Sequence, residues 1–325
     1  MKRYMALVAR SLALLVTLTV VNFFLIHLVP GGPLEVISRA RVESGAAPLS
    51  DAERAMFCRY YGLDRPLGAQ LLAYAAQLAH GDLGYSTFFR RPSSEIIAEY
   101  YKRTTWLVAT GLLVAVCTGL PLGIVSAARR GKWLDSVLLA VEMILHATPP
   151  FLFATVALIV FAVKLQWFPL AGSEAIADPG SVGLADMLRH LALPALSLGV
   201  WESSTVYYLV RNAMVDILGE DYIRTARAKG LGNHEILIRH ALPALLPMLL
   251  ARFAVLFGAA IGGAFFAEQV FSYPGLGQLS LIAFQNYDYL LLRGIFLVLT
   301  ASILMSYLAA DLWLIRFDAG VGDGA

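Results

Sequence analysis

The sequence predicts an all-α polytopic membrane protein with six transmembrane helices. Of its 325 residues, 58% are apolar and only 15% are charged, and the mean hydropathy is +0.68. Soluble domains are nearer 45–50% apolar and about 25% charged. Long uncharged runs recur along the chain, and Lys and Arg gather in the short segments on one side of them. The net charge of +2 gives no reason to expect a nucleic-acid partner.

Each predicted span has about the 20 mostly apolar residues that a helix needs to cross the hydrocarbon core. Four of the runs contain no Asp, Glu, Lys or Arg, and the other two are interrupted once each, by Glu202 and by Arg252. In chain order the runs are 11–29, 104–128, 143–163, 191–210, 241–267 and 294–310. Pro149 and Pro150 are placed to break the third helix.

The distribution of Lys and Arg predicts the orientation. The N-terminal tail and first span, 1–29, are read as an uncleaved helix, because 19 apolar residues exceed the roughly 7–15 of a signal-peptide core. With the N-terminus inside, the short inner segments hold twelve Lys and Arg, whereas the short outer loops hold three. The positive-inside rule then places both termini, including the tail 317–325, in the cytoplasm. The segment 30–103 lies outside, and 104–316 forms a five-helix core.

The outer segment 30–103 carries start and stop signals for three short helices. A capping box begins the first, a proline suits the first turn of the second, and a serine caps the third, which leads into the second span. In chain order these signals are Ser50 with Glu53, Gly62, Pro66, Gly81, and Ser93 or Ser94. Two interpretations remain open: a small helical cap on the outer face, and part of a surface that meets a donor protein.

The inner loop 213–240, between the fourth and fifth spans, reads as two short helices separated by a glycine. Asp221 is suited to cap the first helix, and Gly230 supplies the left-handed residue that ends it. The signals that open the second helix and the fifth span are Asn233, Glu235 and Pro243. A rigid helix–turn–helix suits the transmission of force from a soluble partner. The alternative is a basic connector that merely obeys the positive-inside rule.

At this loop the chain resembles the dipeptide, oligopeptide and nickel branch of the binding-protein-dependent permeases. The branch's Thr-Ala-Arg-Ala-Lys-Gly-Leu stands whole at 225–231, and Leu242-Pro243 follows Gly230 at the family spacing. Further matches lie in order at 29–31 (Val-Pro-Gly), 62–67 (Gly-Leu-Asp-Arg-Pro-Leu), 81–84 (Gly-Asp-Leu-Gly), 121–123 (Pro-Leu-Gly), 193–196 (Leu-Pro-Ala-Leu) and 273–277 (Tyr-Pro-Gly-Leu-Gly). The chain departs from the family at His240, usually an isoleucine, and in the ending at 317–320. The long outer segment resembles the first of two paired permeases.

The resemblance implies a permease subunit in the bacterial inner membrane that forms half of a pathway for di- or oligopeptides. It implies that 225–230 is a coupling helix, seated in a groove of a cytoplasmic ATPase subunit. The implied partners are a second permease subunit, two ATPase subunits that carry ATP and Mg, a substrate-binding protein and membrane lipid. This chain would bind no cofactor or metal and would hold no catalytic residue. The residues implied in coupling are Glu220, Asp221, Tyr222, Arg224, Thr225, Ala226, Arg227, Ala228, Lys229, Gly230 and Leu231.

Other function classes lack their signals. The one Gly-Lys pair, at 131–132, is followed by Trp133 and has no upstream phosphate-loop glycine, so ATP must be bound by another chain. A secondary transporter would be expected to show inverted repeats with paired broken helices, and a hydrolase a G-x-S-x-G elbow. Cys58 and Cys117 are far apart, which indicates neither a disulfide framework nor a metal site. The substrate stays open among peptides, nickel chelates, oligosaccharides and opine-like compounds.

Glu142, Glu202 and Arg252 lie in or beside predicted spans, where charges are costly unless they face protein or water. Two interpretations remain open: they line the translocation path, or they pair within the bundle. At the helical rise, Glu202 lies about 15 Å and Arg252 about 18 Å from the inner ends of their spans. This similar depth predicts a direct ion pair. Glu268, near the outer end of the fifth span, is read as structural.

Overall fold

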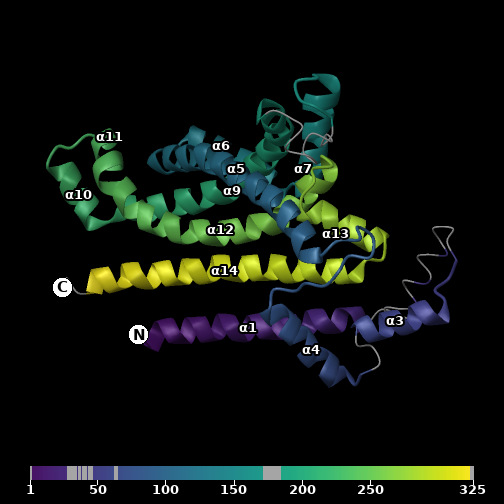
Figure 1. The fold of residues 1–325 in the computed structure, drawn as a ribbon. Coiled ribbons are helices and arrows are strands. Elements are labelled where there is room, and N and C mark those ends of the chain that lie inside the picture. Colours follow the sequence, from purple (N-terminus) through teal and green to yellow (C-terminus); the bar gives the residue numbers. More distant parts are fainter. Residues whose placement is uncertain are drawn as a thin grey trace. The chain divides into compact units, whose positions relative to one another are not determined.

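The computed structural model describes residues 2–27, 47–61, 65–170 and 184–322, with the separate positions 35, 38 and 42 (Figure 1). Within these residues the only strand-like contact is an isolated bridge between Tyr85 and Pro92, so the all-α prediction is confirmed. The helices are α1 Lys2–His27, α3 Asp51–Tyr61, α4 Leu67–Ala79, α5 Ser93–Ala128, α6 Trp133–Ala147, α7 Pro150–Ala157, the π-helical η1 Leu158–Lys164, α9 Leu184–Gly219, α10 Asp221–Ala228, α11 Asn233–Ile236, the π-helical η2 Leu237–Ala241, α12 Leu242–Val270, α13 Leu276–Gln285 and α14 Tyr289–Gly322.

Four of the described helices are long and apolar enough to cross a membrane, and they contain the predicted second, fifth and sixth spans and most of the first. Their bounds are Tyr4–Phe24, Ser93–Ala128, Asn233–Val270 and Tyr289–Ile315. Helix α6 together with α7 and η1 is also long and apolar enough to form one further crossing, although the two parts are bent by 101° relative to each other. The protein is therefore a multi-pass membrane protein, and its described residues contain four to five apolar spans by length and composition.

The bend between α6 and α7 follows from the two prolines. A residue before proline is driven out of the helical region, and both Thr148 (ψ 126°) and Pro149 (ψ 137°) are extended. Pro150 then begins α7, where its missing amide is not needed. The indole N–H of Trp201 donates to the carbonyl of Thr148 at 2.9 Å. The predicted break is confirmed, and the backbone oxygen freed by it has a partner inside the chain.

The predicted fourth span, 191–210, lies within the 36-residue α9. This helix is long enough to cross a membrane but is not apolar enough to count among the four. The reason is its polar centre, where Glu202, Ser203 and Ser204 follow one another. All three side chains are nevertheless buried, at 6%, 3% and 1% exposed. Because α9 packs against α6, α7 and α12, its polar groups face neighbouring helices rather than the surroundings.

The chain divides into two compact units. Unit 1 comprises residues 1–103 and 275–304, and unit 2 comprises 104–274 and 305–325. The core of unit 1 joins the start of α5 to α13 and to the first turns of α14. A Cβ on Gly294 would lie 2.8 Å from Cδ1 of Ile97, so a larger residue here would require the end of the Ile97 side chain to shift. The core residues are Ile96, Ile97, Leu276, Leu279, Ala283, Leu291 and Ile295.

Asp288 is a buried carboxylate of unit 1, with 1% of its surface exposed. Its Oδ1 accepts the N–H of Leu291 at 3.2 Å, which caps the first turn of α14. Its Oδ2 accepts the hydroxyl of Ser86 at 2.5 Å and the N–H of Phe88 at 3.1 Å. Asp288 therefore ties the turn at 85–92 to the beginning of the last helix.

The predicted helices of the segment 30–103 are found in part. The capping box is confirmed: Ser50 N–H donates to Glu53 Oε2 at 2.9 Å, and Glu53 N–H donates to Ser50 Oγ at 3.3 Å. The stop expected at Gly62 lies outside the described residues. The second helix is α4, which follows Pro66 and ends just before Gly81. The third is not a separate helix, because α5 continues without a break from Ser93 to Ala128.

Unit 2 is held by close contacts between α5 and α9. A Cβ on Gly119 would lie 2.5 Å from the carbonyl oxygen of Ser203, and one on Gly199 would lie 2.5 Å from that of Gly111. Neither backbone oxygen can move without shifting its helix. Small residues that let two helices approach are typical of packing within membranes. They fix α9 against α5 along the stretch that leads to the inner loop.

Candidate functional site

The loop after α9 folds around its own small apolar cluster. Ile223 and Ala226 are three residues apart and share a face of α10. They are 0% and 6% exposed, and they pack with Ile236 of α11, which is 1% exposed. Fully burying an isoleucine side chain contributes roughly 1.5–3 kcal/mol. The predicted helix–turn–helix is therefore present as a folded unit.

The end of α10 is a Schellman motif built on Gly230. Gly230 has φ +84°, a left-handed conformation that side chains with a Cβ disfavour. Its N–H donates to Arg227 O at 2.9 Å, and the N–H of Leu231 donates to Ala226 O at 3.3 Å. Leu231 also packs onto the apolar cluster, the hydrophobic contact that accompanies this motif. The glycine stop is confirmed.

The starts of the two helices differ from expectation by one residue. Glu220, not Asp221, is the N-cap of α10, and no side-chain hydrogen bond caps it. Asp221 instead pairs with Arg224 at 3.1 Å on the exposed surface. Gly232 precedes α11 in the place expected for Asn233, and Glu235 binds Arg239 at 2.6 Å. Ile223 and Ile236 hold the two helices together, so neither start needs a side-chain cap.

The remaining coupling-loop residues are largely accessible. Ala226 is buried and Leu231 half-buried, as the cluster requires. Tyr222 is an exposed aromatic side chain, 46% accessible. The face that α10 and its C-terminal residues present to the surroundings consists of Glu220, Asp221, Tyr222, Arg224, Thr225, Arg227, Ala228, Lys229 and Gly230. This face combines cations, a rigid aromatic ring and a small residue, which suits a seat in a groove of another protein.

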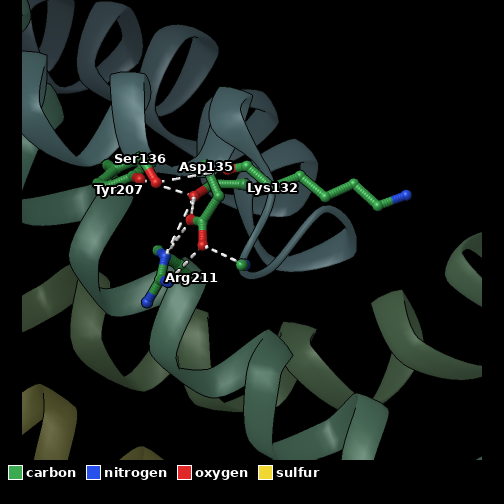
Figure 2. A network of polar contacts seen from close by, with 7 residues as sticks. Lys132, Asp135, Ser136, Tyr207 and Arg211 are labelled. Carbon is green, nitrogen blue, oxygen red and sulfur yellow. Dashed lines mark hydrogen bonds and ion pairs between the residues drawn. The ribbon is translucent and has the colours of Figure 1, made fainter.

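A buried polar network lies in unit 2 near the same end of α9 (Figure 2). Asp135, in the first turn of α6, is 3% exposed and receives a bidentate contact from Arg211 of α9. Nε donates to Oδ1 at 2.9 Å, and Nη2 donates to Oδ2 at 3.0 Å. Ser126 of α5 donates to Asp135 Oδ1 at 2.5 Å, and the N–H of Gly131 donates to Oδ2 at 3.0 Å. This geometry is the strong form of a carboxylate–guanidinium pair.

The number of hydroxyl hydrogens in the network determines which way the Ser126–Tyr207 hydrogen bond runs. The hydroxyls of Ser126 and Tyr207 are 2.7 Å apart. Because Ser126 gives its only hydrogen to Asp135, Tyr207 donates to Ser126. The network thus joins the end of α5, the turn before α6 and the part of α9 that lies ten residues before α10.

Sequence reasoning missed Asp135. Arg211 is one of the twelve Lys and Arg of the short inner segments, and the sequence around it does not indicate a partner. The available signal was an acidic residue in the first turn of a largely apolar helix, four positions after Gly131. Such a residue needs a cation or several donors if the helix lies in a membrane.

The predicted pair of Glu202 and Arg252 is not formed. A Cβ built on Gly263 would lie 3.7 Å from Glu202 Oε1, so Glu202 lies beside Gly263 of α12. Gly263 is eleven residues, roughly 16 Å, beyond Arg252 along α12, and Arg252 is exposed. The depth estimate was wrong because the helix of the fifth span extends inward to Asn233. His240 therefore does not mark its inner end.

The two remaining charges are buried in unit 2. Glu142 is 2% exposed, and its Oε2 has no hydrogen-bond partner among the described residues. Glu268 is 0% exposed, and its Oε1 accepts the hydroxyl of Thr104 at 2.6 Å. These contacts give Glu268 a structural role within the bundle.

The fold and the loop define a multi-pass helical membrane protein with a rigid connector helix between two of its long helices. The family model of the binding-protein-dependent transport system inner membrane component matches residues 119–323. The chain belongs to this family, the membrane permeases of ATP-driven importers. In these importers, partner subunits hydrolyse ATP and a binding protein supplies the substrate.

Relatives of known name agree with this assignment. The chain is 37% identical over 304 residues to a putative peptide permease protein of Brucella suis, covering 93% of each chain. It is 33% identical over 306 residues to the glutathione transport system permease protein GsiC of Salmonella choleraesuis, covering 93% of this chain and 94% of that one. Its fold is similar to a chain of the inward-facing MetNI methionine transporter, with 19% identity and a TM-score of 0.55. That match covers 68% of this chain and 95% of the other.

Proposed function

We propose that α10 is the docking element through which ATPase subunits drive this permease. The observation that carries the proposal is the build of the loop. Ile223 and Ala226 anchor one face of α10, Gly230 ends the helix sharply, and the opposite face is free to contact a partner. A force applied to such a helix is transmitted to α9 rather than absorbed by a flexible connector. The set 220–231 is the proposed contact surface.

The proposed topology has six spans with both termini in the cytoplasm of a bacterial cell and 30–103 outside its inner membrane. Burial of Glu202, Ser203 and Ser204 supports α9 as a further crossing, the fourth along the chain, which brings the total to six. A helix surrounded by protein does not need an apolar surface. The twelve Lys and Arg of the short inner segments support the orientation.

The proposed assembly contains this chain, a second homologous permease subunit, two ATPase subunits that bind ATP and Mg, and a substrate-binding protein. Di- or oligopeptides are the proposed substrate class, supported by relatives named as peptide and glutathione permeases. Glu142 and Glu202 are candidates for the wall of the pathway, because both are carboxylates held inside unit 2.

The docking surface is tested by enlarging one exposed small residue. Ala228→Trp adds a large ring to the free face of α10 without entering the apolar cluster. We expect the permease to be inserted normally but to lose most of its co-purifying ATPase and its peptide uptake. Arg130→Trp, at an exposed position in the turn between α5 and α6, is the matched control. Equal ATPase recovery from both variants would refute docking at α10.

A further inference from the structure

Helix α4 has no face that suits water. Its 13 residues include no Asp, Glu, Lys or Arg, and besides Tyr74 only Gln70 and Gln77 carry polar side chains. An apolar stretch of this length is too short to span a bilayer; such stretches are usually buried core helices or interfacial segments. The exposure of α4 excludes the first of these for most of its surface: Leu67 is 51% exposed and Leu72 is 74% exposed.

One residue of α4 fixes it to the membrane-crossing helices of unit 1. Tyr74 is 4% exposed, and its ring stacks on Phe23 of α1 with centroids 5.8 Å apart. The guanidinium of Arg293, in α14, lies 4.0 Å from the centroid of the same ring, a cation–π contact. Asn22 of α1 donates to the carbonyl oxygen of Arg293 at 2.9 Å. Three helices therefore meet at Tyr74.

These contacts set the height of α4 relative to the bilayer. Phe23 is the penultimate residue of the apolar stretch Tyr4–Phe24, and Arg293 is the fifth residue of the stretch Tyr289–Ile315. Both anchors therefore lie where their helices leave the hydrocarbon core. A helix resting on them lies at the boundary between acyl chains and headgroups.

The exposed surface of α4 continues the lipid-facing surface of α1. No residue in the most apolar 18-residue part of α1 is buried inside the protein. Near the end of the stretch Tyr4–Phe24, Val21 is 50% and Phe24 is 40% exposed. On α4 the exposed positions besides Leu67 and Leu72 are Gly68, Ala69, Ala75, Ala76, Gln77 and Ala79. Exposed polar residues flank the helix, Arg65 before it and His80 and Asp82 after it. Polar ends around an apolar surface are expected of a segment that lies along an interface.

We propose that α4 is a membrane-surface helix whose exposed face contacts the lipid acyl chains beside the C-terminal end of α1. It is neither a water-exposed cap nor a docking site for a soluble donor protein. In this position α4 also holds Tyr74 against Arg293 and so braces the start of α14. The proposal requires only that α1 and α14 cross the bilayer, and is independent of which side is cytoplasmic and of ATPase docking.

The test is spin labelling of the assembled transporter in proteoliposomes. After Cys58→Ser and Cys117→Ser, a nitroxide is attached to Leu72→Cys or Ala76→Cys. Power saturation then measures collision with oxygen, which dissolves in lipid, and with a water-soluble nickel chelate. Leu14→Cys on the exposed face of α1 is the lipid control, and Arg130→Cys in the basic turn before α6 is the water control.

We expect both α4 labels to match the Leu14 label, with high oxygen and low nickel collision rates. High rates for both reagents, as at Arg130, would show a helix in water and overturn the proposal. Low rates for both reagents would show a face covered by protein and would overturn it equally. Adding the substrate-binding protein should leave the α4 rates unchanged, whereas a fall in both rates would reassign the face to that partner.

Discussion

Two segments of unit 2 are fastened near the same end of α9 by opposite means. The turn between α5 and α6 is held by charge, through the bidentate pair of Asp135 with Arg211. The loop that contains α10 is held by apolar contacts of Ile223 with Ala226 and Ile236. A buried ion pair has one acceptable geometry and leaves a stranded charge when broken, whereas an apolar cluster has no preferred direction. The turn is thus locked to α9 by a directional contact, whereas the loop packs against Leu218 near the end of α9 through its small apolar cluster.

Breaking the charged attachment should have the largest effect. Asp135→Asn leaves Arg211, 15% exposed, without a counter-charge, and we expect a loss of about 3–5 kcal/mol in the free energy of unfolding. Denaturant titration of the purified protein in detergent measures it. The double variant with Arg211→Gln should be less destabilised than the sum of the two single variants. Strict additivity would show that the pair contributes nothing as a unit.

Removing the apolar attachment should cost somewhat less. Ile223→Ala leaves a cavity beneath α10, and we expect a loss of about 2–4 kcal/mol, confined to the loop. Hydrogen exchange should show faster exchange of the α10 amides with little change in α6. Ile238→Ala, at a position that is 51% exposed, is the matched control and should leave exchange unchanged. Faster exchange in α6 as well would mean that the two attachments are not separate.

Replacing Gly230, which ends α10, should lower the free energy of unfolding less than the two previous changes but should impair coupling to the ATPase more. Gly230→Val places a β-branched residue at φ +84°, which costs roughly 1–2 kcal/mol or more. We expect normal insertion but loss of the stimulation of ATPase activity by the binding protein. Gly232→Val, two residues further at φ −71° and ψ 154°, should retain this stimulation. Stimulation retained by both variants would remove the left-handed turn from the mechanism.

The smallest effect is expected at the exposed ion pair of α10. Asp221 and Arg224 are 3.1 Å apart, but their side chains are 93% and 72% exposed. Water screens such a pair, so Asp221→Ala should not change the unfolding free energy measurably. Any fall in ATPase co-purification with this variant would then report docking alone. A clear loss of stability would show that α10 is held by more than its apolar cluster.

The same contrast explains what could be predicted from the sequence. The inner loop carries local signals, and Gly230 ends α10 where it stands, so the two helices were placed nearly to the residue, although Pro243 lies inside the helix it was expected to open. Asp135 and Arg211 are 76 residues apart, and nothing local announces their contact. The pairing of Glu202 with Arg252 failed for a related reason, since it required the relative register of two helices.

Counting spans met a similar limit. Hydropathy identifies helices that face lipid, whereas the centre of α9 faces other helices of the protein. Glu202 interrupts the apolar run 191–210, yet it and its neighbours Ser203 and Ser204 are almost completely buried against other helices. The length of 191–210 suggested a span, but what surrounds a polar helix depends on contacts that only the folded chain defines.

Asp288 also sets an order of events during synthesis. The turn that it holds begins at Ser86, 202 residues earlier in the chain. Until residue 288 has emerged from the ribosome, the hydroxyl of Ser86 and the N–H of Phe88 lack the carboxylate they later share. A chain that ends before α14 therefore leaves this turn without its closing contact, whatever the state of the helices already inserted. The closed turn is therefore a mark that synthesis has passed residue 288.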